Sequence, residues 1–154
     1  MKMKKTLVIG LGSILRGDDG LGTRVIEELK KEKFAENVSL RCADTSGLDI
    51  LKYFPDFTRV IIIDLAQMQA RPGTIKVFSS REIKKSKFSD VLTTHGMALL
   101  ETLTLAEKLG IPSRITIIGV QPKDVSFRLG LSDILEKKVP SVINRVRGLL
   151  KQKN

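Results

Sequence analysis

The sequence is poor in the residues that build disulfides, zinc sites and stacking surfaces. Its 154 residues include one cysteine, one tyrosine, one histidine and no tryptophan. The single cysteine, Cys42, excludes an internal disulfide and any zinc site made from several cysteines. The scarcity of aromatic residues argues against a surface that stacks nucleic-acid bases. Together with the start of the chain, described next, this composition predicts a cytoplasmic protein.

Long hydrophobic runs are also missing. The basic start, Met1–Lys5, is followed by an apolar run that ends at Ile9. This run has the length of a strand and is too short for a signal peptide or a membrane span. We therefore expect no membrane partner. A hydrophobic content of 42% is ordinary for a globular protein, and the length predicts one domain spanning residues 1–154.

Acidic residues are outnumbered. The chain has 27 Lys and Arg against 17 Asp and Glu, which gives a formal net charge of +10. Such a balance favours acidic partners, so a nucleic-acid- or nucleotide-binding module is one alternative function, with steeply salt-dependent binding. The basic residues are scattered along the chain, however, which is typical of a solvated surface. We expect no nucleic-acid partner.

The hydrophobic pattern alternates strands with helices. Continuous apolar runs predict buried strands at residues 6–9, 60–63 and 115–120. A short strand is expected at 38–42, and an alternating run predicts an antiparallel edge strand at 74–78. Helices are expected over 21–30, 48–53, 94–109 and 132–149, the last capped by Ser132 and divided or kinked at Pro140. Residues 79–93 show no period and are predicted to be a mobile loop. The fold class is therefore α/β, a three-layer sandwich with a mostly parallel sheet, one antiparallel edge strand and helices on both faces.

A glycine-rich segment, Gly10–Gly22, joins the first strand to the first helix. Leu15 stands where a dinucleotide-binding loop has its third glycine, and acids stand where a phosphate-binding loop has Lys and Ser or Thr. Because carboxylates repel phosphate, we predict no nucleotide site here. Asp18 is interpreted as a cap of the first helix, and Asp19 as an acid displayed at the end of the strand.

Two carboxylates and one imidazole are expected at the same edge of the sheet. Asp19 follows the first strand, Asp64 ends the most apolar strand, and His95 opens a helix. Ligands of such folds bind at the carboxyl ends of the strands, and this mixed set of oxygen and nitrogen donors suits a divalent transition metal. The structural alternatives are a first-turn acid, a loop cap and a structural histidine.

Several motifs then carry a resemblance over nearly the whole chain. The matching segments are Gly10-Leu11-Gly12 through Gly17-Asp18-Asp19-Gly20-Leu21-Gly22, Ile62-Ile63-Asp64 with Pro72-Gly73, Thr94-His95-Gly96, Ile117–Pro122 and Gly130-Leu131-Ser132. In their order and approximate spacing they resemble the [NiFe]-hydrogenase maturation endopeptidases. The departures are Ser13, where the family usually has asparagine, and Gly96, where many members have a larger or acidic residue.

The resemblance implies a five-stranded α/β sandwich and a nickel-dependent peptidase that trims a hydrogenase large subunit. Carried over by motif, the metal ligands are Asp19, Asp64 and His95, with Asp19 and Asp64 also expected to activate water, and Gly47 and Gly96 to contact substrate. The implied partner is the large-subunit precursor, which loses a C-terminal peptide after nickel insertion. Nickel would arrive on that substrate, and no organic cofactor is expected. A non-catalytic assembly factor that checks the metal is the main alternative.

Overall fold

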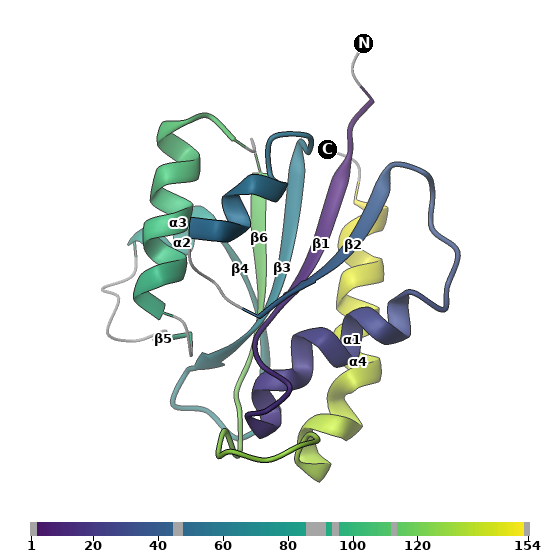
Figure 1. The fold of residues 1–154 in the computed structure, drawn as a ribbon, viewed down its shortest axis with the longest axis vertical. Coiled ribbons are helices and arrows are strands. Elements are labelled where there is room, and N and C mark those ends of the chain that lie inside the picture. Colours follow the sequence, from purple (N-terminus) through teal and green to yellow (C-terminus); the bar gives the residue numbers. More distant parts are fainter. Residues whose placement is uncertain (1–2, 45–47, 86–91, 94–95, 112–113, 153–154) are drawn as a thin grey trace.

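The computed structural model describes residues 3–44, 48–85, 92–93, 96–111 and 114–152. In this part of the chain one mixed sheet has the strand order β2-β1-β3-β6-β4, and β5 pairs with the end of β3 (Figure 1). The strands are β1 (Thr6–Leu11), β2 (Val38–Ala43), β3 (Arg59–Gln67), β4 (Ile75–Ser79), β5 (Leu92–Thr93) and β6 (Arg114–Val120). All pairs on the main path are parallel except β4 with β6, which confirms the mostly parallel sheet with an antiparallel edge strand.

Helices cover both faces of this sheet, as expected for a sandwich (Figure 1). The α-helices are α1 (Leu21–Leu29), α2 (Ser80–Lys85), α3 (Gly96–Lys108) and α4 (Asp133–Lys151), and the 3-10 helices are η1 (Gly17–Gly20) and η2 (Leu48–Tyr53). Helices α1 and α4 lie on one face, and α3 with η2 lies on the other. Among the described helices, none is long and apolar enough to span a membrane.

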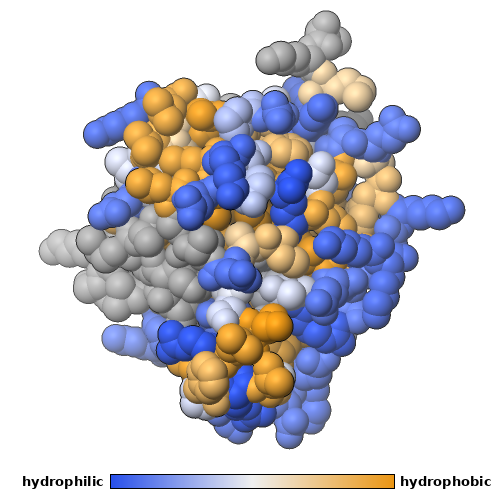
Figure 2. Space-filling model, viewed as in Figure 1, coloured by the Kyte–Doolittle hydropathy of each residue, from blue (hydrophilic) through white to orange (hydrophobic). Residues whose placement is uncertain are grey.

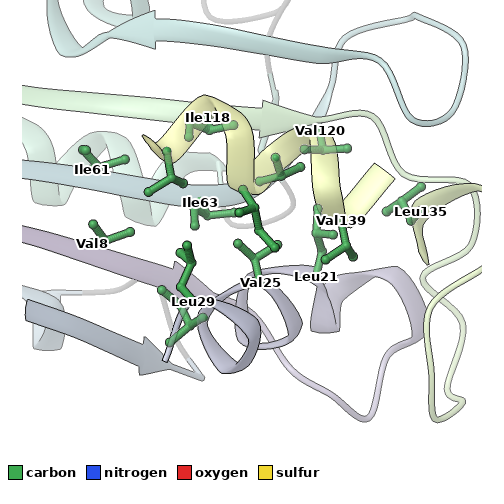
Figure 3. Packing of buried hydrophobic residues seen from close by; sticks show 14 of the residues in the cluster. Val8, Leu21, Val25, Leu29, Ile61, Ile63, Ile118, Val120, Leu135 and Val139 are labelled. Carbon is green, nitrogen blue, oxygen red and sulfur yellow. The ribbon is translucent and has the colours of Figure 1, made fainter. Parts of the chain in front are cut away.

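The core has two layers because the central strands are apolar on both sides. Val8, Ile61 and Ile63 pack against α1 and α4 (Figure 3). The alternate residues of the same strands, such as Ile9 and Ile62, pack against α3 and η2. Strands buried on both faces read as continuous apolar runs, which is why the sequence reveals them clearly.

Strand β3 is longer than the sequence suggested. The prediction that it ends at Asp64 is wrong, because pairing continues to Gln67. Asp64 stands opposite Gly119 of β6, Leu65 opposite Val120, and Ala66 opposite Thr93 of β5. The neighbouring strands, and not the end of the apolar run, decide where β3 stops.

The prediction of a mobile loop over 79–93 is wrong for its described ends. Helix α2 follows β4 directly, and its start is held by a reciprocal pair in which Glu82 accepts from the Ser79 N–H and the Ser79 hydroxyl accepts from the Glu82 N–H. This is a capping box, which stabilises the first turn of a helix. Ile83 then anchors the helix in the core at 5% exposure. Residues 86–91 lie outside the described part.

Helix α4 is continuous through Pro140, so of the two predicted outcomes the division is wrong and the kink stays a prediction. Its start agrees with the prediction, because the Ser132 side chain accepts from the Leu135 N–H. One face of the helix is buried at Leu135, Val139 and Val142. Burial along a stripe of this kind outweighs the one backbone hydrogen bond that a proline removes.

Candidate functional site

The two predicted acids lie at the carboxyl edge of two neighbouring parallel strands. Gly10 of β1 pairs with Ile63 of β3, so the residues that follow Gly10 run beside Asp64. Helix η1, which carries Asp19, comes directly after this loop and contacts β3. Both acids are buried, with exposures of 4% for Asp19 and 1% for Asp64. The structure therefore brings their two segments together at one edge.

The backbone of its own loop holds Asp19 in place. The Ser13 N–H donates to Asp19 Oδ2 at 2.9 Å. Gly12 has a φ of +120°, and a Cβ there would lie 2.1 Å from the Asp19 carbonyl oxygen and 2.9 Å from Oδ1. Only glycine tolerates both this backbone conformation and this approach. Since Ser13 braces Asp19 through its main chain, the departure from asparagine leaves that brace intact.

Asp64 faces the α3 side of the sheet. Its side chain lies on the same side of β3 as that of Ile62, which belongs to the core layer that packs against α3. The Leu65 N–H donates to Asp64 Oδ1 at 2.8 Å. Its partner across the ladder, Gly119, has no side chain, and a Cβ there would come within 2.9 Å of the Ala66 Cβ. Asp64 is thus a buried carboxylate on the apolar face of β3, next to a glycine of the neighbouring strand.

The remaining predicted site residues are not tested. His95 and Gly47 lie outside the described residues. Gly96 is the first residue of α3, and its assignment to substrate binding stays a prediction. Within the ranges that the structure describes, no three His, Cys, Asp or Glu side chains are grouped so that they could hold a metal ion. The three-ligand set therefore remains a prediction from the sequence.

Asp18 does not cap the first helix, so that prediction is wrong. The residue that precedes α1 is Gly20. The Asp18 carboxylate is fully buried and accepts hydrogen bonds from the Lys123 and Asp124 N–H groups at 2.8 and 2.9 Å. It also accepts from the Ser132 N–H and hydroxyl. Asp18 therefore ties the loop after β1 to the loop after β6, a role that the sequence analysis missed.

Gln121 fixes the loop that follows β3. Its side chain is 6% exposed, and Oε1 accepts from the Met68 N–H at 2.7 Å. Its Nε2 donates to Gln67 Oε1 at 2.8 Å. A buried amide with these partners holds the chain just beyond Asp64 in one conformation. Gln121 thus positions the edge of the site.

Cys42 is not an activated nucleophile. It lies half-buried in β2, and burial raises the pKa of its thiol above the ordinary value. Because the thiolate is the reactive form, a raised pKa makes the side chain less reactive at neutral pH.

Known proteins resemble this chain over most of its length. The family model for hydrogenase maturation proteases matches residues 23–148. A putative hydrogenase maturation protease of Methanocaldococcus jannaschii is 32% identical, covering 99% of this chain and all of the relative. The hydrogenase expression/formation protein HupD of Rhizobium leguminosarum is also 32% identical, but the match covers 79% of this chain and 61% of that longer protein.

A solved structure shows the same fold. HybD, a hydrogenase maturating endopeptidase from Escherichia coli, superposes with a TM-score of 0.85 at 25% identity. The superposition covers 96% of this chain and 92% of HybD. The mixed sheet and its covering helices therefore match a peptidase fold, as the resemblance in the motifs implied. The chain belongs to the hydrogenase maturation protease family.

Proposed function

We propose that this protein is the endopeptidase that removes a C-terminal peptide from the precursor of a [NiFe]-hydrogenase large subunit after nickel insertion. The observation that carries the proposal is the pair of buried carboxylates, Asp19 and Asp64, held at one sheet edge in a chain of this family. Burying a carboxylate lowers the stability of a fold unless the group is hydrogen-bonded or paired. Two buried carboxylates at one sheet edge therefore favour a chemical role.

The donor set fits a nickel ion carried by the substrate. Asp19 and Asp64 supply carboxylate oxygens, and His95 supplies the imidazole in the set predicted from the sequence. A backbone N–H holds each described carboxylate in place, Ser13 donating to Asp19 and Leu65 to Asp64. The ion would orient the precursor, with these residues contacting it while it stays on the substrate.

The acids of this chain would also activate water. A carboxylate takes a proton from water as the water oxygen attacks the scissile carbonyl carbon, and it returns the proton to the leaving amine as the C–N bond breaks. The products are a new C-terminal carboxylate on the large subunit and a released peptide. Asp64 is 1% exposed, so the fold keeps this carboxylate in one place for such a role.

Intact-mass measurement of the precursor tests the proposal. A cognate large-subunit precursor is incubated with the protein, once loaded with nickel and once without it. We expect loss of one C-terminal peptide from the loaded form alone, and loss of that activity in Asp64→Asn. The matched control is Asp56→Asn, the same change at an exposed acid in the turn before β3, which should leave cleavage unchanged.

Three outcomes contradict the proposal. An unchanged precursor mass with tight binding of the loaded form would favour the non-catalytic assembly factor. Equal cleavage with and without nickel would remove the metal from recognition. Full activity and unchanged nickel binding in Asp64→Asn would show that the chemistry lies elsewhere.

A further inference from the structure

Four large apolar side chains are exposed on the two loops beside the candidate site. Phe127 is 86% exposed and Leu129 72%, while Ile14 and Leu15 are about half exposed. We call these four residues the loop patch. Figure 2 shows hydrophobic residues gathered at the lower end of the visible face, where Figure 1 places the loops after β1 and β6. An exposed apolar cluster of this kind marks an interaction surface more often than a single exposed leucine does.

The backbone beneath the loop patch is fixed by hydrogen bonds. The Arg128 N–H donates to the Leu15 carbonyl at 3.0 Å, and the Gly17 N–H donates to the Arg128 carbonyl at 2.8 Å. Arg16 and Arg128 form a parallel bridge between the two loops. The buried Asp18 carboxylate ties the same loops a few residues away. Apolar groups held out by a preorganised backbone lose little conformational entropy when a partner covers them.

A hollow lies next to the loop patch. Its volume is about 360 Å³, and its lining includes Ile14 and Leu129 from the patch together with Leu131. Arg24 and Glu136, which pair at 2.9 Å, form part of its polar wall. A hollow of this size takes one or two side chains of another protein, and a central pocket of this type is where interface energy concentrates.

We propose that the loop patch is the docking surface for the folded body of the precursor, and this rests on the proposed function. The patch and Asp19 share the segment 13–19, and the Ser13 N–H is bonded to the Asp19 carboxylate. Ile14 and Leu15 follow Ser13 directly, so a partner seated on the patch lies next to the segment that braces Asp19. Docking there holds the precursor while its C-terminal segment runs along the sheet edge.

The charges around the loop patch indicate what kind of protein surface would bind it. Exposed basic residues, Arg16 and Lys123, flank the loop patch, and the whole chain carries a net charge of +10, although the adjoining hollow also includes the acids Glu27 and Glu136. The complementary face is an apolar surface with acidic side chains at its rim. Hydrophobic contact supplies the affinity of such a complex, and the opposite charges supply orientation and speed of association.

Steady-state cleavage of the nickel-loaded precursor tests this inference. We expect Phe127→Ser and Leu129→Ser to raise KM about tenfold each while kcat stays within about twofold, because the patch binds the precursor and takes no part in bond cleavage. Phe127→Leu should restore most of the affinity. The matched control is Leu109→Ser, a change at a 60% exposed leucine beyond α3, which should leave KM unchanged.

The possible outcomes distinguish failure of the docking surface from failure of the proposed peptidase function. If the wild-type protein leaves the precursor uncut, both are overturned. If the wild-type protein cuts and Phe127→Ser keeps its KM, only the docking surface is overturned. It is also overturned if kcat falls at constant KM, if Phe127→Ser abolishes binding to anionic lipid vesicles instead, or if it merely converts a dimer of this chain to monomers. Unfolding midpoints equal to that of the wild type confirm that the variants are folded.

Discussion

Asp18 and Ser132 stand 114 positions apart in the chain, yet the Asp18 carboxylate accepts from both the N–H and the hydroxyl of Ser132, at 2.7 and 3.0 Å. Ser132 is also the N-cap of α4, so its hydroxyl accepts from the Leu135 N–H as well. One buried carboxylate thus links the loop after β1 to the start of the last helix. Donors and acceptors match because an ionised carboxylate only accepts.

Asp18→Asn should lower the free energy of unfolding by about 3 kcal/mol. Within the described residues the carboxylate accepts four hydrogen bonds, and an amide in its place turns one acceptor into a donor that faces buried N–H groups. Urea unfolding followed by circular dichroism measures the change. Asp56→Asn, at an exposed position, should change stability by less than about 0.5 kcal/mol. A loss below about 1 kcal/mol for Asp18→Asn would contradict the assigned role.

Gly12→Ala should reduce cleavage at least about a hundredfold. The new Cβ would meet both the carbonyl oxygen and the carboxylate of Asp19, and the φ of +120° would be strained. Gly148→Ala is the matched control, because its Cβ meets nothing within 4 Å on α4. That change should raise the free energy of unfolding by about 0.5–1 kcal/mol and leave cleavage intact. Equal activity of the two variants would show that the position of Asp19 is unimportant.

Arg59→Met should leave stability unchanged or raise it by about 1 kcal/mol. Arg59 is 2% exposed, its Nη1 donates to the Leu149 carbonyl, and its Nε and Nη2 have no partner in the described structure. Burial, reinforced by Arg114, lowers the pKa of Arg59, a sign that the charged form is poorly accommodated. An apolar group of similar size removes this cost.

The Leu149 carbonyl keeps a second donor, the Gln152 N–H, after the arginine is replaced. Arg59→Ala removes the packing of the stem as well and should cost about 2 kcal/mol. Thermal unfolding distinguishes the two variants. A loss above about 2 kcal/mol in Arg59→Met would mean that the charge at the end of α4 is itself stabilising.

Alkylation of Cys42 should be slow in the folded protein. Burial raises the pKa of the thiol, so at pH 8 a smaller fraction is thiolate than in a free cysteine, and the rate should keep rising above the pH where a free thiol reaches its plateau. Iodoacetamide labelling with and without urea measures the difference, and the single cysteine makes the signal unambiguous. Cys42→Ala should cleave the precursor at the wild-type rate. Rapid labelling of the folded protein at neutral pH would contradict the burial argument.

The central strands could be predicted from the sequence because both of their faces are buried. Continuous apolar runs mark β1, β3 and β6 without ambiguity. The ends of the strands were harder to predict, since β3 continues to Gln67 only because β6 and β5 provide partners there. Helix α2 was missed although Ser79 and Glu82 have the spacing of a capping box, a local signal that could have revealed it.

The candidate site was predictable in part for a similar reason. Asp19 follows β1 and Asp64 lies in β3, which are parallel neighbours, so placing them at one edge needs only the pattern and the rule that ligands bind at the carboxyl ends of parallel strands. The role of Asp18 could not be found in this way, because its partners lie more than a hundred residues away and carry mostly backbone donors. Its position just before a predicted helix indicated a helix cap instead.

The position of β6 in the sheet has a consequence for synthesis of the protein. Strand β6 lies between β3 and β4, so β4 leaves the ribosome before the strand that it pairs with. The loop that carries Asp18 and Asp19 is likewise tied to residues 123–132. A nascent chain can therefore form β1, β2 and β3 early, but the edge that carries the candidate site is assembled only when the last third of the polypeptide has emerged. The candidate site therefore forms late in folding, after the residues that bind the Asp18 carboxylate are present.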